Sequence, residues 1–65
     1  MDKNQRLIKR RKELNLTQEE VARLAGILRP YYNMIENGKK VPSLPIAKKI
    51  AKVLRSGVDA LFYDV

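Results

Sequence analysis

The sequence predicts an all-α fold of five short helices, and three observations carry that prediction. Apolar residues recur at helical spacing, and no stretch alternates long enough to form a strand. Helix start and stop signals divide the chain into short segments. The 65 residues are 45% hydrophobic, which is enough for one packed core and too few for two. We therefore expect residues 1–65 to form a single domain.

The first helix is expected from about Lys3 to Leu14, because Leu7 and Leu14 lie a heptad apart. Asn15 suits a left-handed cap at its end. Leu16 follows and is expected to be a plug, that is, a buried apolar residue in the connection between two helices.

The second helix begins with a capping box, in which the Thr17 hydroxyl accepts from the Glu20 amide and the Glu20 carboxylate reaches back. Gly26 ends it after about eight residues, since glycine adopts positive φ without strain. A helix this short needs tertiary packing to be stable. Ile27 is expected to be a second plug.

The third helix is expected over residues 29–36, with Pro30 tolerated in its first turn and Asn37-Gly38 ending it. Ser43 is the expected N-cap of the fourth helix. That helix carries a buried stripe made by Ile46, Ala47, Ile50, Ala51, Val53 and Leu54. A last short helix is expected over residues 58–62.

The amino-acid composition limits the classes of function that we expect. Without Cys or His, the chain has no disulfide, no thiolate metal site and no imidazole base, so we expect neither a cofactor nor catalysis. No apolar run approaches 20 residues and no signal peptide is visible, so a cytoplasmic protein without a membrane span is expected. Fourteen Lys and Arg against seven Asp and Glu give a charge of +7, which attracts polyanions.

Two short helices joined by Ala25-Gly26-Ile27 form a tight corner of the kind found in helix-turn-helix units. Further motifs keep the same order along the chain: Leu16-Thr17-Gln18-Glu19-Glu20-Val21-Ala22, Ile35-Glu36-Asn37-Gly38, Pro42-Ser43-Leu44 and Val58-Asp59-Ala60-Leu61-Phe62. In these motifs, over about residues 5–62, the chain resembles the helix-turn-helix family of lambdoid phage Cro and repressor proteins and their bacterial relatives. The resemblance implies a compact five-helix, lambda-repressor-like domain with its motif at about 17–37. It also implies a transcriptional regulator that binds double-stranded DNA, usually as a homodimer.

Carried over by position, the resemblance places base-reading residues on the third helix at Arg29, Pro30, Asn33 and Met34. Their chemistry is compatible with this role. Arg29 can pair with guanine and Asn33 with adenine, whereas Pro30 and Met34 offer only apolar contact. Contact of Arg29 with a phosphate remains an alternative to contact with a base. The hypothesis requires Arg29 and Asn33 to be held outward.

Phosphate contacts are expected on both sides of that helix. The resemblance places one at Gln18, where the N-terminus of a helix favours an anion. A second clamp follows the third helix, and Tyr31 lies beside it. The expected phosphate residues are Gln18, Tyr31, Asn37, Gly38, Lys39 and Lys40. The lysines at 48, 49 and 52 are interpreted as a solvated face.

Arg11 and Glu36 match a family pair that bridges the first and third helices. Glu36 ends a helix, where an anion is unfavourable, and this favours a cationic partner. The chain departs from the family pattern at five positions, namely Leu28, Tyr32, Arg10, Arg55 and Ser56. Leu28 replaces the usual Ser or Thr cap, and Tyr32 a core aliphatic, so that its hydroxyl must find a partner or reach the surface. Arg10 is expected to snorkel, and Arg55 makes the fourth helix's end uncertain.

Apolar residues gather at the C-terminal end, at Val58, Leu61, Phe62, Tyr63 and Val65. Some are expected to close the core and the rest to form a homodimer surface. A two-fold dimer would read a pseudo-palindromic operator, and a repressor is the expected outcome. No small-molecule ligand is expected. The alternative is a protein-interaction module on the same fold, such as an antitoxin or anti-repressor partner.

Overall fold

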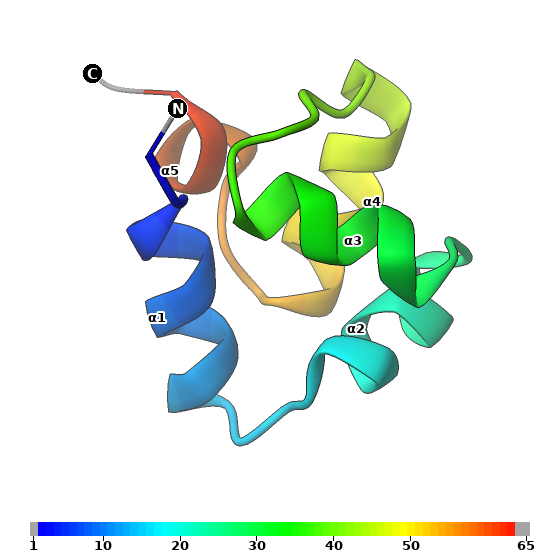
Figure 1. The fold of residues 1–65 in the computed structure, drawn as a ribbon. Coiled ribbons are helices and arrows are strands. Elements are labelled where there is room, and N and C mark those ends of the chain that lie inside the picture. The colour runs from blue at the N-terminus through cyan, green and yellow to red at the C-terminus, as the bar shows by residue number, and fades with distance from the viewer. Residues whose placement is uncertain (1, 64–65) are drawn as a thin grey trace.

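Five helices and no strand make up residues 2–63, the part of the chain that the computed structural model describes. In chain order they are α1 (Gln5–Glu13), α2 (Gln18–Ala25), α3 (Arg29–Glu36), α4 (Leu44–Val53) and α5 (Val58–Phe62). The predicted all-α class is confirmed. Helix α2 packs against α3 and α4, whereas α5 packs against α1 and α4. Figure 1 shows α3 crossing the middle of the molecule, with α1 and α2 on either side of its lower edge.

The core draws on all five helices. Its buried apolar members are Leu7, Val21, Ala22, Ala25, Tyr32, Ile35, Ala47, Ile50, Ala51, Leu54 and Leu61. The expected plugs Leu16 and Ile27 are half-buried and pack against its edge. Within residues 2–63, no helix has the length and apolar content that crossing a membrane requires.

The first four helices end in the same way. Each end contains a residue with positive φ: Asn15 (57°), Gly38 (74°) and Arg55 (54°) directly follow a C-cap, whereas Gly26 (72°) is itself the C-cap of α2. The next amide then bonds a carbonyl five residues back: Leu16 to Arg11 at 3.1 Å, Ile27 to Ala22 at 2.9 Å, Lys39 to Met34 at 2.9 Å and Ser56 to Ala51 at 3.0 Å. These hydrogen bonds pair carbonyl groups that otherwise have no partner at the end of a helix. Arg55 adopts the same conformation as the glycines despite its Cβ.

Helix α1 begins at Gln5, two residues later than predicted, because Asn4 caps it. The Asn4 side chain accepts a 3.0 Å hydrogen bond from the Leu7 amide and donates a 2.9 Å bond to the Leu61 carbonyl. Asn4 therefore joins the start of α1 to α5, which lies beside it in Figure 1.

Arg10 does not simply extend to solvent, as the sequence analysis expects. Its Nε donates to the Leu54 carbonyl at 2.8 Å and its Nη2 to the Arg55 carbonyl at 3.3 Å. Both carbonyls lie just past the end of α4, where the helix dipole favours a cation. The guanidinium thus stabilises the turn that Arg55 forms.

The helix starts match the sequence motifs unevenly. Thr17 and Glu20 form both bonds of the capping box, at 3.1 and 2.9 Å. Leu28 occupies the N-cap of α3 with no side-chain bond, as expected, and Ser43 caps α4 by position only.

Tyr32 is fully buried, and the expectation that its hydroxyl finds a partner or reaches the surface is wrong. Within residues 2–63 that hydroxyl makes no hydrogen bond. Burial, reinforced by the nearby Glu36, raises the pKa of Tyr32 far above its usual value. The phenol therefore stays neutral.

Candidate nucleic-acid interface

The corner between α2 and α3 is set by Gly26. A Cβ built at Gly26 would meet no atom within 4 Å, so its positive φ alone explains the glycine. The chain then passes through Ile27 and Leu28 and enters α3 at Arg29. Leu28, Arg29 and Pro30, at the start of α3, are all exposed.

The start of α3 presents its predicted base-reading residues to solvent. Arg29 and Pro30 are exposed and line one open hollow together with Asn33. Met34 is half-buried. Within residues 2–63 the Arg29 side chain makes no hydrogen bond or ion pair, so its five N–H donors are available. The outward placement required of Arg29 is present.

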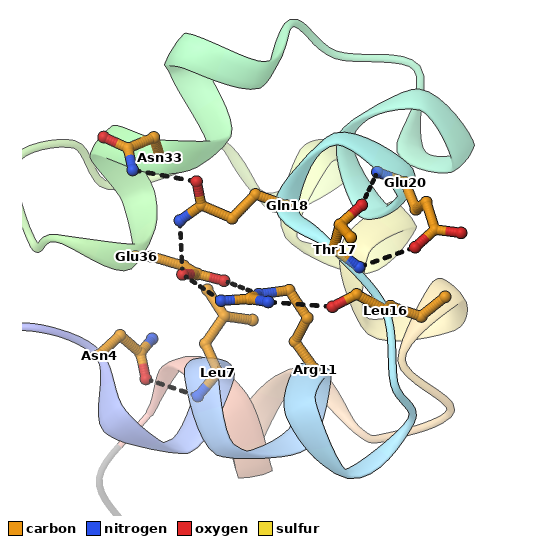
Figure 2. Close-up of polar contacts among 9 residues, drawn as sticks. All are labelled: Asn4, Leu7, Arg11, Leu16, Thr17, Gln18, Glu20, Asn33 and Glu36. Carbon is orange, nitrogen blue, oxygen red and sulfur yellow. Dashed lines mark hydrogen bonds and ion pairs between the residues drawn. The ribbon is translucent and has the colours of Figure 1, made fainter.

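Asn33 is less free than the sequence analysis assumes. It is half-buried, and both ends of its amide are engaged: Nδ2 donates to Gln18 Oε1 at 3.1 Å, and Oδ1 accepts from Asn37 Nδ2 at 3.0 Å. Gln18, drawn beside Asn33 in Figure 2, and Asn37 therefore hold the amide, so the outward placement expected of Asn33 is met only in part. One N–H and one acceptor position remain on Asn33 for another partner.

Gln18 lies between α2 and α3. Its Nε2 donates to Glu36 Oε1 at 2.8 Å, and its Oε1 accepts from Asn33. Figure 2 shows the side chain directed at both partners from the start of α2. One amide hydrogen of Gln18 is left for a phosphate.

The second group of predicted phosphate residues surrounds the end of α3. Lys39 and Lys40 are exposed, whereas Asn37 and Gly38 are half-buried. Tyr31 is also half-buried and packs against the core through its ring. The two lysines are thus the most accessible cations at this end.

Arg11 and Glu36 join α1 to the end of α3. Arg11 Nε lies 2.6 Å from Glu36 Oε2, and Nη2 lies 3.2 Å from Oε1. Burial tends to raise the pKa of Glu36, but the hydrogen bonds from Arg11 and Gln18 outweigh it and the pKa is lowered. The bond to Glu36 in turn raises the pKa of Arg11. Glu36 is therefore an ionised carboxylate at 2% exposure.

The predicted dimer surface is smaller than expected. Leu61 is 3% exposed and belongs to the core, so it is withdrawn from that surface. Val58 and Phe62 are half-buried against the same core, while Tyr63 is 54% exposed. Val65 lies outside the described residues.

A helix-turn-helix family model matches residues 7–61, which include all of α2 and α3. The chain belongs to the helix-turn-helix family of transcriptional regulators. The resemblance seen in the sequence is confirmed.

Family relatives come from bacteria and archaea. The HTH-type transcriptional regulator YqaF of Bacillus subtilis, described as uncharacterized, is 49% identical over 59 residues, covering 91% of this chain and 78% of YqaF. A regulator of Archaeoglobus fulgidus is 40% identical over 52 residues, covering 80% and 73%.

Solved helix-turn-helix proteins share the fold. The restriction-modification controller protein C.AhdI from Aeromonas hydrophila has a TM-score of 0.84 at 36% identity, covering 91% of this chain and 89% of C.AhdI. A chain from the complex of SinR with SinI has the same TM-score at 32% identity, covering 91% and 58%.

The hydrogen bond between Gln18 and Glu36 is not predictable from the sequence, because the two residues lie 18 positions apart and no local pattern joins them. The bonds from Arg10 to the end of α4 are not predictable for the same reason. Both contacts depend on how the helices pack.

Proposed function

We propose that this helix-turn-helix protein is a sequence-specific regulator that binds double-stranded DNA through α3 and performs no catalysis. The observation that carries the proposal is the exposed, unpaired Arg29 at the start of α3, beside Pro30 and Asn33. A guanidinium matches the two acceptors of guanine in the major groove. In this proposal residues 1–65 act as one DNA-binding domain with its motif at about 17–37. The proposed location is the cytoplasm.

In the proposed complex Arg29 and Asn33 read base edges, and Pro30 and Met34 make apolar contacts such as those to a thymine methyl. Lys39 and Lys40 bind phosphates at the end of α3, supported by Asn37, Gly38 and Tyr31. Gln18 donates its remaining amide hydrogen to a phosphate. Glu19 and Glu20 in the first turn of α2 weaken the attraction of that helix end for an anion. We therefore assign most of the phosphate affinity to the two lysines.

We further propose that two copies bind a pseudo-palindromic operator as a repressor. Tyr63, Val41 and Phe62 line one hollow of about 170 Å³, whose lining also includes Asp2, Asn4 and Lys40; Tyr63 and Val41 are 54% and 80% exposed. Pairing of this surface would cover side chains that the monomer leaves in water. A dimer bound to its operator excludes other proteins from the same duplex, which is sufficient for repression.

A protein-interaction role on the same fold is the second candidate. Leu28 is 76% exposed at the N-cap of α3, where a polar cap is usual. One solved relative, SinR, forms a complex with another protein, SinI. Stoichiometric capture of a protein partner, together with no shift of any duplex, would favour this candidate over DNA binding.

Selection of bound sites from random duplex DNA tests the proposed function. We expect enrichment of one pseudo-palindrome whose half-sites lie about 34–36 Å apart. If a dimer contacts about eight phosphates, log affinity falls against log salt with a slope of about −7. Equal affinity for the selected and random duplexes at every salt concentration would refute the proposal.

A further inference from the structure

Three hydrogen bonds connect the interior of the protein to the outward face of α3. Glu36 Oε1 accepts from Gln18 Nε2 at 2.8 Å, Gln18 Oε1 accepts from Asn33 Nδ2 at 3.1 Å, and Asn33 Oδ1 accepts from Asn37 Nδ2 at 3.0 Å. Figure 2 shows Gln18 bonded to both Asn33 and Glu36, and Arg11 bonded to Glu36 in turn. We call Glu36, Gln18, Asn33 and Asn37 the amide chain.

The direction of the amide chain is set at its buried end. An ionised carboxylate can only accept hydrogen bonds, and Glu36 is held ionised by the two-point contact with Arg11. Gln18 must therefore turn its NH2 group toward Glu36, which leaves its carbonyl oxygen facing Asn33. That oxygen also only accepts, so Asn33 must turn its own NH2 group toward Gln18.

The fixed orientation of the Asn33 amide affects which base it can recognise. An asparagine pairs with adenine by donating to N7 and accepting from N6, so the positions of its nitrogen and oxygen must match the base. An amide turned over by 180° presents the opposite pattern and mispairs. An unsupported asparagine can take both orientations, whereas Asn33 is held in one.

We propose that Gln18 is a positioning residue that fixes the amide orientation of Asn33 and so determines which base pair Asn33 recognises. The proposal rests on the proposed DNA-binding function. It differs from a phosphate contact, which adds affinity for every duplex and carries no sequence information.

Gln18→Leu tests the proposal, because it removes both polar ends of the side chain at similar size and leaves the Arg11–Glu36 pair in place. Affinities are measured for the selected operator and for duplexes changed at one base pair at a time. Comparison of the wild type with Asn33→Ala identifies the base pair that Asn33 reads. At that base pair we expect Gln18→Leu to lower discrimination about tenfold, with discrimination at the other base pairs unchanged.

Combination with Asn33→Ala provides the matched control. Once the Asn33 amide is gone, Gln18→Leu should cause no further loss of discrimination. Lys40→Ala should weaken all duplexes alike and leave every ratio unchanged. Gln18→Ala removes the same amide without adding bulk, and it serves if the leucine variant does not fold.

The free protein provides a readout independent of DNA. In a nitrogen–proton NMR spectrum, the side-chain NH2 pair of Asn33 should move toward the position of exposed asparagine amides in the Gln18 variants. Undiminished discrimination at the Asn33 base pair, with or without a uniform loss of affinity across all duplexes, would overturn the positioning role and leave the proposed function standing. A wild-type protein without any sequence preference would instead overturn the proposed function.

Discussion

Arg11 and Glu36 meet at two points, 2.6 and 3.2 Å apart, although they are 25 residues apart in sequence. Arg11 also donates to the Leu16 carbonyl at 2.9 Å, so one guanidinium ties α1 both to the end of α3 and to the connection before α2. The pair is well shielded, with side-chain exposures of 12% and 2%. Its geometry holds α3 against α1 and maintains the charge on which the amide chain depends.

Removal of one partner should cost far more than removal of both. Arg11→Met leaves a buried carboxylate without its cation, and we expect the free energy of unfolding to fall by about 3 kcal/mol. The double variant Arg11→Met with Glu36→Leu should recover most of that loss. Urea unfolding monitored by circular dichroism measures both. A double variant no more stable than the single variant would contradict this account.

Stability should fall in acid, and Glu36 should contribute to the fall. Its folded-state pKa lies below its usual value of 4.5, so the stability it provides is complete above that pH. That stability is lost as the pH falls from about 4.5 through the lower folded-state pKa. Glu36→Gln should be less stable than wild type near pH 7 and should show a shallower acid decline. Unfolding curves between about pH 3 and 7 test this, and parallel declines would argue against it. Glu20, whose pKa is lowered by its bonds to Thr17, declines in both proteins and cancels.

Tyr32→Phe should stabilise the protein. The hydroxyl is buried without a hydrogen bond within residues 2–63, and such a group costs about 1–3 kcal/mol. We expect the free energy of unfolding to rise by about 1 kcal/mol, with DNA affinity unchanged. A decrease in stability would show that the hydroxyl makes a favourable contact with Glu36 or Arg11.

Arg55→Gly should also stabilise the protein, because Arg55 adopts φ of 54° at the end of α4. A side chain with a Cβ is strained in this region, and glycine is not. The expected gain is about 0.5 kcal/mol after the greater freedom of glycine in the unfolded chain is counted. Arg55→Ala is the matched control, since it removes the charge and keeps the Cβ. An equal gain in both variants would assign the effect to charge.

Local signals predicted most of the fold. The Thr17–Glu20 capping box, Gly26, Asn15 and Gly38 each act within a few residues, so the sequence marks the helix boundaries that they form. The start of α1 differs from the prediction because Asn4 caps it through the Leu7 amide, a local signal that the helical spacing of Leu7 and Leu14 does not contain. The turn at Arg55 was uncertain from the sequence, and the role of Arg10 was missed. Both depend on contact between α1 and the end of α4.

The candidate site was predicted in outline only. The resemblance located Arg29, Asn33 and Gln18 on the right elements, but it treated each as an independent contact. The hydrogen bond between Asn33 and Gln18 depends on the angle between α2 and α3, which no spacing in the sequence encodes. Leu61 was assigned to a dimer for a similar reason, since an apolar residue near the end of a chain can serve either a core or a partner.

The most direct test of the central claim compares Arg29→Ala with Lys40→Ala on the selected operator and on operators changed at single base pairs. We expect Arg29→Ala to relax preference at one base pair by about tenfold, while Lys40→Ala weakens every duplex equally and lowers the salt slope by about one. Unchanged preference at every base pair in Arg29→Ala would contradict the claim that α3 reads DNA sequence from its first turn.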